Sequence, residues 1–102
     1  MRFALALMLG LVTTQALANE ASVDIDNFSF TPAHLVVAPG TKVTWTNHDD
    51  IPHTVFNRET PKDLHSPVLD TDDHWSAVLD RPGVYGFFCS LHPHMQMQVE
   101  VR

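Results

Sequence analysis

The sequence predicts an all-β sandwich or barrel, and three observations support this. Short segments of alternating apolar and polar residues recur along the chain, and Pro and Gly turn signals separate them. No segment keeps a 3.6-residue apolar period over three turns, so long helices are not expected. The alternation is clearest where Val43 and Trp45 stand between Thr and Lys residues. With 102 residues, the chain has room for one such domain.

Each strand follows from this alternation and from the turns beside it. Pro39-Gly40 and Pro82-Gly83 are turn pairs, because Pro presets φ and Gly accepts a positive φ. The polar stretch 57–66 has no clear periodicity, and we expect a loop there. In chain order, the strands are expected from Val23 through Ile25 toward Phe28, and at Leu35–Val37, Thr41–Asn47, His53–Phe56, Trp75–Leu79, Val84–Cys89 and Gln96–Val101.

The first eighteen residues have the pattern of an export signal. Arg2 supplies a short positive region, residues 3–12 are almost wholly apolar, and Ala16-Leu17-Ala18 is a small-x-small cleavage pattern. Polar residues at 13–15 end the apolar run well short of the roughly 20 residues that a membrane span needs. We therefore expect cleavage after Ala18, export to the periplasm and no membrane insertion.

Removal of the signal leaves 84 of the 102 residues, 19–102, which we expect to form a single domain. Loss of Arg2 takes the formal net charge from −6 to −7, and this acidic balance excludes nucleic acid as a partner. The only cysteine, Cys89, can form no intrachain disulfide and no multi-cysteine metal site. Because a free thiol is vulnerable in an oxidising compartment, we expect Cys89 to have a bonding partner.

The segment 89–95 carries the candidate metal ligands. Cys89, His92 and Met95 place a thiolate, an imidazole and a thioether within seven residues, directly after an expected strand. This soft donor set suits copper, which cycles between Cu(I) and Cu(II). His53 can supply a second imidazole, because a sandwich can bring its strand end beside that of Cys89. We therefore predict a trigonal plane of His53, Cys89 and His92 around one copper ion, with Met95 as a weak axial ligand.

The same residues resemble a known family. YGFFCSLHPHM at 85–95 resembles the copper-ligand loop of the cupredoxins, in the short Cys-x2-His-x2-Met form of amicyanin-type proteins. VTWTN at 43–47 and IPHTV at 51–55 resemble the segment that leads to the first copper histidine, and the likeness extends over 21–101. The resemblance implies a Greek-key β-sandwich of the cupredoxin type that holds one type 1 copper. It also implies a small soluble one-electron carrier, not an enzyme.

Two residues depart from the family pattern. Thr54 stands where many cupredoxins carry Asn, and we expect its hydroxyl to reach the backbone of Cys89–Ser90. His94 replaces a large apolar residue beside the exposed ligand edge. We expect electrons to pass through His92 in a monomer, since weak redox encounters need only a small interface. The expected docking rim for redox donor and acceptor proteins comprises Leu91, Pro93 and His94.

Two other copper functions are less consistent with the sequence. A protein that sequesters or delivers copper is typically marked by a Met- or His-rich tract around an open site. A copper enzyme needs a second or trinuclear centre, which a chain with one Cys cannot build. Outside the four ligands we expect Trp45, Trp75 and Met97 in the core, and His34, His48, His65 and His74 on the surface. We also expect Asp49–Asp50 and Asp70–Asp73 to be solvated turns, with docking of a basic partner as the alternative.

Overall fold

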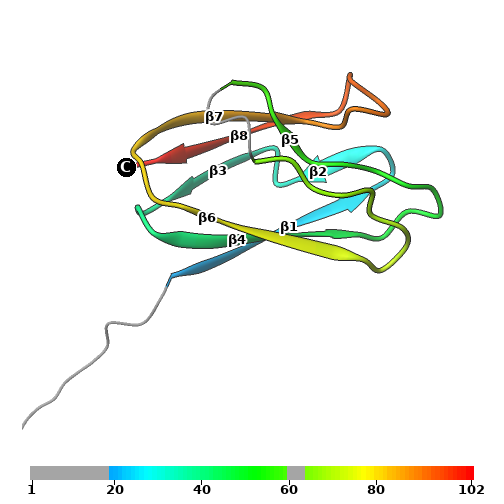
Figure 1. Cartoon of the computed structure of the whole chain (residues 1–102), viewed down its shortest axis with the longest axis horizontal. Helices are drawn as coiled ribbons and strands as arrows, with labels where there is room; N and C mark the ends of the chain where they lie inside the picture. The colour runs from blue at the N-terminus through cyan, green and yellow to red at the C-terminus, as the bar shows by residue number, and fades with distance from the viewer. Residues whose placement is uncertain (1–18, 60–63) are drawn as a thin grey trace, which may run out of the picture.

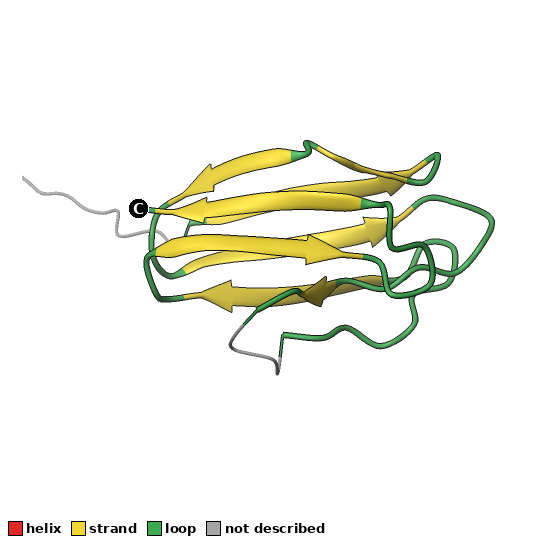
Figure 2. Ribbon diagram, turned by 90° about the horizontal axis from the view of Figure 1, so that it is seen from above, coloured by secondary structure: helices red, strands yellow, loops and turns green. Residues whose placement is uncertain are grey.

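The computed structural model describes residues 19–59 and 64–102 and has two β-sheets packed face to face (Figures 1 and 2). This confirms the predicted all-β sandwich. The proposed signal, residues 1–18, lies outside the described residues. No described helix is long and apolar enough to cross a membrane.

Each sheet has four strands and contains one parallel pair. The first has the order β2-β1-β4-β6, with β1 at Glu20–Asp26, β2 at Ser29–Thr31, β4 at Thr41–Asn47 and β6 at His74–Leu79. The second has the order β3-β8-β7-β5, with β3 at His34–Val37, β8 at Gln96–Val101, β7 at Gly83–Phe88 and β5 at Phe56–Asn57. β1 runs parallel to β4, and β3 runs parallel to β8. The chain therefore crosses between the sheets repeatedly, which brings loops from distant segments to one end.

Most predicted strands are present, but the expected strand at His53–Phe56 is wrong. β5 starts only at Phe56, and His53 makes a single bridge to Leu69. The reason lies in the partners of the intervening N–H groups. Thr54 N–H points to the Cys89 sulfur at 3.4 Å, and Val55 N–H donates to the Ser66 hydroxyl at 2.8 Å. These groups are therefore not available for a regular ladder.

The chain between β1 and β2 also differs from the expectation. β1 ends at Asp26, so the first strand does not continue to Phe28. Asn27 and Phe28 have φ values of 52° and 58°, a left-handed conformation that is uncommon for residues with a side chain. The short strand β2, which the sequence pattern did not indicate, follows this turn. The turn thus redirects the chain at the end of the sandwich where β4 also ends.

The core is centred on Trp45, as predicted. Its ring lies 5.4 Å from that of Trp75, which is half-buried, and 4.9 Å from that of Phe87. Its indole N–H donates to the sulfur of Met97 at 3.3 Å, and Met97 is buried as expected. Phe87 and Cys89 face this core together, because residues two apart on a strand share a face. The core therefore supports the segment that carries the thiol.

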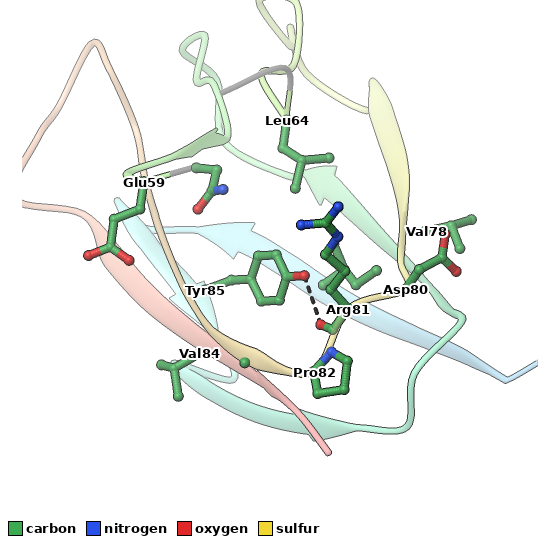
Figure 3. Close-up of a pocket in the computed structure, with 11 residues that line it drawn as sticks. Glu59, Leu64, Val78, Asp80, Arg81, Pro82, Val84 and Tyr85 are labelled. Carbon is green, nitrogen blue, oxygen red and sulfur yellow. Dashed lines mark hydrogen bonds between the residues drawn. The ribbon is translucent and has the colours of Figure 1, made fainter. Parts of the chain in front are cut away.

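The turns at the opposite end are short and leave a pocket of about 510 Å³ around 80–83 (Figure 3). Figure 3 shows the Tyr85 hydroxyl reaching the Arg81 carbonyl, to which it donates at 2.8 Å. The pocket lies near the start of β7, whereas Cys89 follows its end. The lining contains none of the predicted copper ligands, so the pocket is not the candidate site.

Candidate metal centre

The structure brings three of the predicted ligands together. The donor atoms of His53, Cys89 and His92 all lie within 4.8 Å of one another. The Cys89 Sγ lies 3.6 Å from the Nδ1 of His53 and 3.7 Å from the Nδ1 of His92. His53 and Cys89 are fully buried and His92 is half-buried. The cluster therefore has one edge near solvent and two sides enclosed by protein.

A tight loop after β7 places Cys89, His92 and Met95. The N–H of His92 donates to the Cys89 carbonyl at 3.3 Å, and the N–H of Met95 donates to the His92 carbonyl at 2.9 Å. The N–H of Cys89 donates back to the Met95 carbonyl at 3.2 Å. This backbone ring closes the loop before β8 starts at Gln96. Met95 is buried in the same loop, at 2% exposure.

His53 reaches the cluster from the loop after β4. Its backbone exchanges two hydrogen bonds with Leu69, at 3.1 and 2.8 Å, which anchors an otherwise irregular segment. Figure 1 shows this loop, in green, at the same end of the sandwich as the orange loop between β7 and β8. The expected closeness of His53 and Cys89 is therefore present, although His53 lies in a loop and not at the start of a strand.

The spacing of the donor atoms fits a metal ion. Metal bonds of about 2.0 Å to nitrogen and about 2.3 Å to sulfur, at trigonal angles, separate the two donors by roughly 3.7 Å. The distances of 3.6 and 3.7 Å from the Cys89 sulfur to the two imidazole nitrogens are close to this value. A site of one thiolate and two imidazoles binds copper in preference to hard cations. The residues present therefore fit a copper ion.

Thr54 links the two ligand loops. Its hydroxyl oxygen accepts from the Ser90 N–H at 2.8 Å and lies 2.7 Å from the Ser90 hydroxyl. Its own N–H points to the Cys89 sulfur at 3.4 Å. The expectation that this hydroxyl reaches the Cys89–Ser90 backbone is confirmed. The loop that carries His53 and the loop that carries Cys89 are thus connected by hydrogen bonds directly beside the cluster.

Replacement of Thr54 by Val is expected to lower the free energy of unfolding by about 1 kcal/mol, because the Ser90 N–H loses its acceptor. Thr54→Ser keeps the hydroxyl and is the matched control, expected to remain near the wild type. Urea unfolding of the three proteins measures the difference. Equal stability of the Val and Ser variants would show that the hydroxyl does not hold the loops together.

Asp49 is a residue of this site that sequence reasoning missed. Its carboxylate accepts from the Nε2 of His53 at 2.8 Å, and also from the N–H groups of Asn27 at 2.6 Å and Phe28 at 3.0 Å. Burial raises the pKa of Asp49, but the hydrogen bonds from Phe28, His53 and Asn27 outweigh it and bring the pKa below its ordinary value. The prediction of a solvated turn is therefore wrong for Asp49. The local sequence around an Asp in a turn does not indicate which distant groups its carboxylate will contact.

The other surface predictions are confirmed. Leu91, Pro93 and His94 are exposed around the half-buried His92. The turn Asp70–Asp73 is exposed, and so are the remaining histidines, His34, His48, His65 and His74. The sequence did not indicate the position of Phe28, whose ring meets those of His53 and His92 edge-on at 5.7 and 5.2 Å. Phe28 is 43% exposed and borders the open edge of the cluster.

Comparisons with known proteins agree with this geometry. The profile of the family described as copper binding proteins, plastocyanin/azurin family, matches residues 17–102. Amicyanin-alpha of Methylorubrum extorquens is 32% identical over 90 residues, which cover 85% of this chain and 76% of the relative. Chloroplastic plastocyanin of Tetradesmus obliquus is 34% identical over 88 residues, 74% of this chain and 61% of the relative.

Two solved structures show the same fold. A purple cupredoxin from Nitrosopumilus maritimus has a TM-score of 0.76 at 32% identity, covering 80% of this chain and 99% of that chain. An amicyanin in its Cu(I) form has a TM-score of 0.77 at 26% identity, covering 86% of this chain and 87% of that chain.

Proposed function

We propose that this chain, which belongs to the plastocyanin/azurin family of copper-binding proteins, carries single electrons between redox proteins of the periplasm. The amicyanin and plastocyanin members of the family are electron carriers and not enzymes. We assign His53, Cys89, His92 and Met95 as the ligands of one type 1 copper. The observation that supports this most strongly is the cluster of one sulfur and two nitrogen donors.

The protein's own residues fit this task. Bound copper supplies the Cu(I)/Cu(II) couple, and a site intermediate between the geometries that the two states prefer needs little rearrangement. Full burial of His53 and Cys89 excludes water from two sides of the site. The Thr54 link and the backbone ring of the 89–95 loop hold the donors at fixed distances. These features favour fast electron transfer over chemistry on a substrate.

The exposed edge of His92 is the proposed route for electrons. It is half-buried, while its neighbours Leu91, Pro93 and His94 are exposed and form a rim around it. We propose that donor and acceptor proteins dock on this rim in turn, and that the protein acts as a monomer. A small contact of this kind is typical of transient redox encounters.

The compartment follows from the first eighteen residues. We propose that they are a signal peptide, cleaved after Ala18, and that the mature single domain, 19–102, works in the periplasm. In a periplasmic extract of cells that express the full chain, N-terminal sequencing is expected to begin at Asn19. Recovery of the uncleaved chain from the cytoplasm would contradict this proposal.

A copper titration followed by optical and EPR spectroscopy tests the function. One Cu(II) per chain is expected to give an intense visible charge-transfer band and a reversible one-electron couple, and Cys89→Ser is expected to lose the band. His94→Ala, which changes an exposed histidine of the same loop, is expected to keep it. A colourless wild type, or one that binds copper no better than Cys89→Ser, would reject the assignment.

The rate at which a chelator removes copper, measured together with the redox couple, separates an electron carrier from a protein that delivers copper. Delivery requires a metal that an acceptor can reach, whereas two of the three clustered ligands are fully buried here. We therefore expect slow loss of copper to a chelator together with a reversible couple. Rapid transfer of the metal without a reversible couple would favour the delivery function.

A further inference from the structure

Asp49 connects the β1–β2 turn to the buried imidazole of His53. We propose that Asp49 is a positioning residue, which fixes the orientation and tautomer of His53 and lowers the reduction potential of the site. The inference rests on the proposed function, because it takes His53 as a copper ligand.

The hydrogen bond decides which nitrogen of His53 is free. The Asp49 carboxylate can only accept, so the Nε2 of His53, 2.8 Å away, carries the proton. The Nδ1, which faces the Cys89 sulfur at 3.6 Å, is then left with a lone pair for a metal. The His53 side chain has 0% exposure, so water cannot replace the carboxylate as its partner.

Asp49 is itself held from both sides, which makes it a rigid support. The N–H groups of Asn27 and Phe28 converge on its two oxygens at 2.6 and 3.0 Å, as consecutive N–H groups do in anion-binding turns. Its own N–H donates to the side-chain oxygen of the buried Asn47 at 2.9 Å. The Asp49 side chain is only 12% exposed.

The same contact places Phe28. Its N–H group is bound by Asp49, and its ring lies edge-on against both His53 and His92. The carboxylate therefore holds a buried ligand on one side and the aromatic border of the open edge on the other. This geometry explains why two residues without glycine's freedom keep a positive φ in this turn.

The expected effect on the metal follows from the charge. A carboxylate that accepts the outer proton of a ligating histidine increases the basicity of the ring, and loss of such a partner typically costs 10–100-fold in metal affinity. Because Cu(II) has the higher charge, the carboxylate increases the affinity for Cu(II) more than the affinity for Cu(I). If Cu(II) alone loses about tenfold, the one-electron potential rises by about 59 mV.

Three variants test the proposal in the copper-loaded protein. Asp49→Ala removes charge and acceptor, Asp49→Asn removes the charge but keeps an acceptor oxygen, and Asp49→Glu restores both. Asp50→Asn is the matched control, because it removes the same charge from the exposed neighbouring residue. Voltammetry gives the potential of each copper-loaded protein, and NMR of the same proteins without metal reports which nitrogen of His53 carries the proton.

We expect the Asn and Ala variants to raise the potential by the shift that a tenfold loss of Cu(II) affinity produces. Glu should restore part of the wild-type value, and Asp50→Asn should change the potential little. Without metal, the wild type should show a slowly exchanging proton on the Nε2 of His53, whereas Asp49→Ala should show a mixture of the two tautomers. A potential in Asp49→Asn that matches the Asp50→Asn control, or a wild-type proton on Nδ1, would overturn the proposal.

A failure of the proposed function gives a different result. The wild type would then lack the visible copper band, while the Nε2 proton of His53 would still be present in the metal-free protein if Asp49 orients the ring. A visible band with no dependence of the potential on Asp49 would leave the electron carrier intact and reject only the role of Asp49.

Discussion

Copper is expected to raise the free energy of unfolding by about 4 kcal/mol when the free metal is present at about a thousand times its dissociation constant. The stabilisation requires that only the folded chain binds tightly. His53 and Cys89 lie 36 residues apart in sequence, and their donor atoms meet only because two strand ends of the sandwich are adjacent. An unfolded chain offers no such preformed site. Copper would thus connect the two ligand loops of a small domain that has no disulfide.

Thermal or urea unfolding of the copper-loaded and copper-free proteins measures this difference. Cys89→Ser is expected to lose nearly all of the copper-dependent gain, and His92→Ala most of it. His94→Ala is the matched control, since His94 is exposed in the same loop, and it should keep the gain. If copper stabilised Cys89→Ser as much as the wild type, the metal would be binding elsewhere on the chain.

The sequence predicted those site residues that lie close together along the chain. Cys89, His92 and Met95 lie within one loop, so their spacing alone suggests a common metal. The alternation along β7 also predicts that Cys89 shares the inward face of Phe87, and both are fully buried. His53 was found by chemistry, because a trigonal copper site lacks an imidazole without it. The alternating strands predicted most of the sandwich in the same way.

The part that could not be predicted depends on register between distant strands. β1 runs parallel to β4, with Ile25 opposite Asn47, and this register brings the turn after β1 beside the loop that contains Asp49. Nothing in the local sequence fixes such a pairing. The three donors to Asp49 come from two separate segments, so an Asp-Asp pair in a loop looked like a solvated turn. Phe28 was placed in a strand for the same reason.

The short β5 illustrates a second limit, which is competition for backbone partners. The sequence predicts a strand at His53–Phe56, but the N–H of Thr54 faces the Cys89 sulfur and that of Val55 faces a serine hydroxyl. These two N–H groups therefore bind side chains in place of the carbonyls of a neighbouring strand. Two departures from the predicted strands, at 27–28 and at 53–55, lie beside the candidate ligands.

Truncation of Trp45 to Ala is expected to lower the free energy of unfolding by about 3–5 kcal/mol, which is a large share of the stability of a small domain. Trp45 is fully buried and packs against Trp75 and Phe87 from both sheets. Its removal leaves a cavity between the sheets that the neighbouring strands can fill only in part. Urea unfolding of the copper-free protein measures the loss without the contribution of the metal.

Trp45→Phe separates packing from the indole hydrogen bond. Phe keeps an aromatic ring between the sheets but cannot donate to the Met97 sulfur, which accepts the indole N–H at 3.3 Å in the wild type. Since a thioether is a weak acceptor, its loss should cost little, and we expect less than half of the destabilisation caused by Ala. Because none of the proposed ligands is changed, both variants should show the visible copper band under conditions where they are folded. Equal destabilisation by Phe and Ala would show that the N–H to sulfur contact, and not packing, dominates at Trp45.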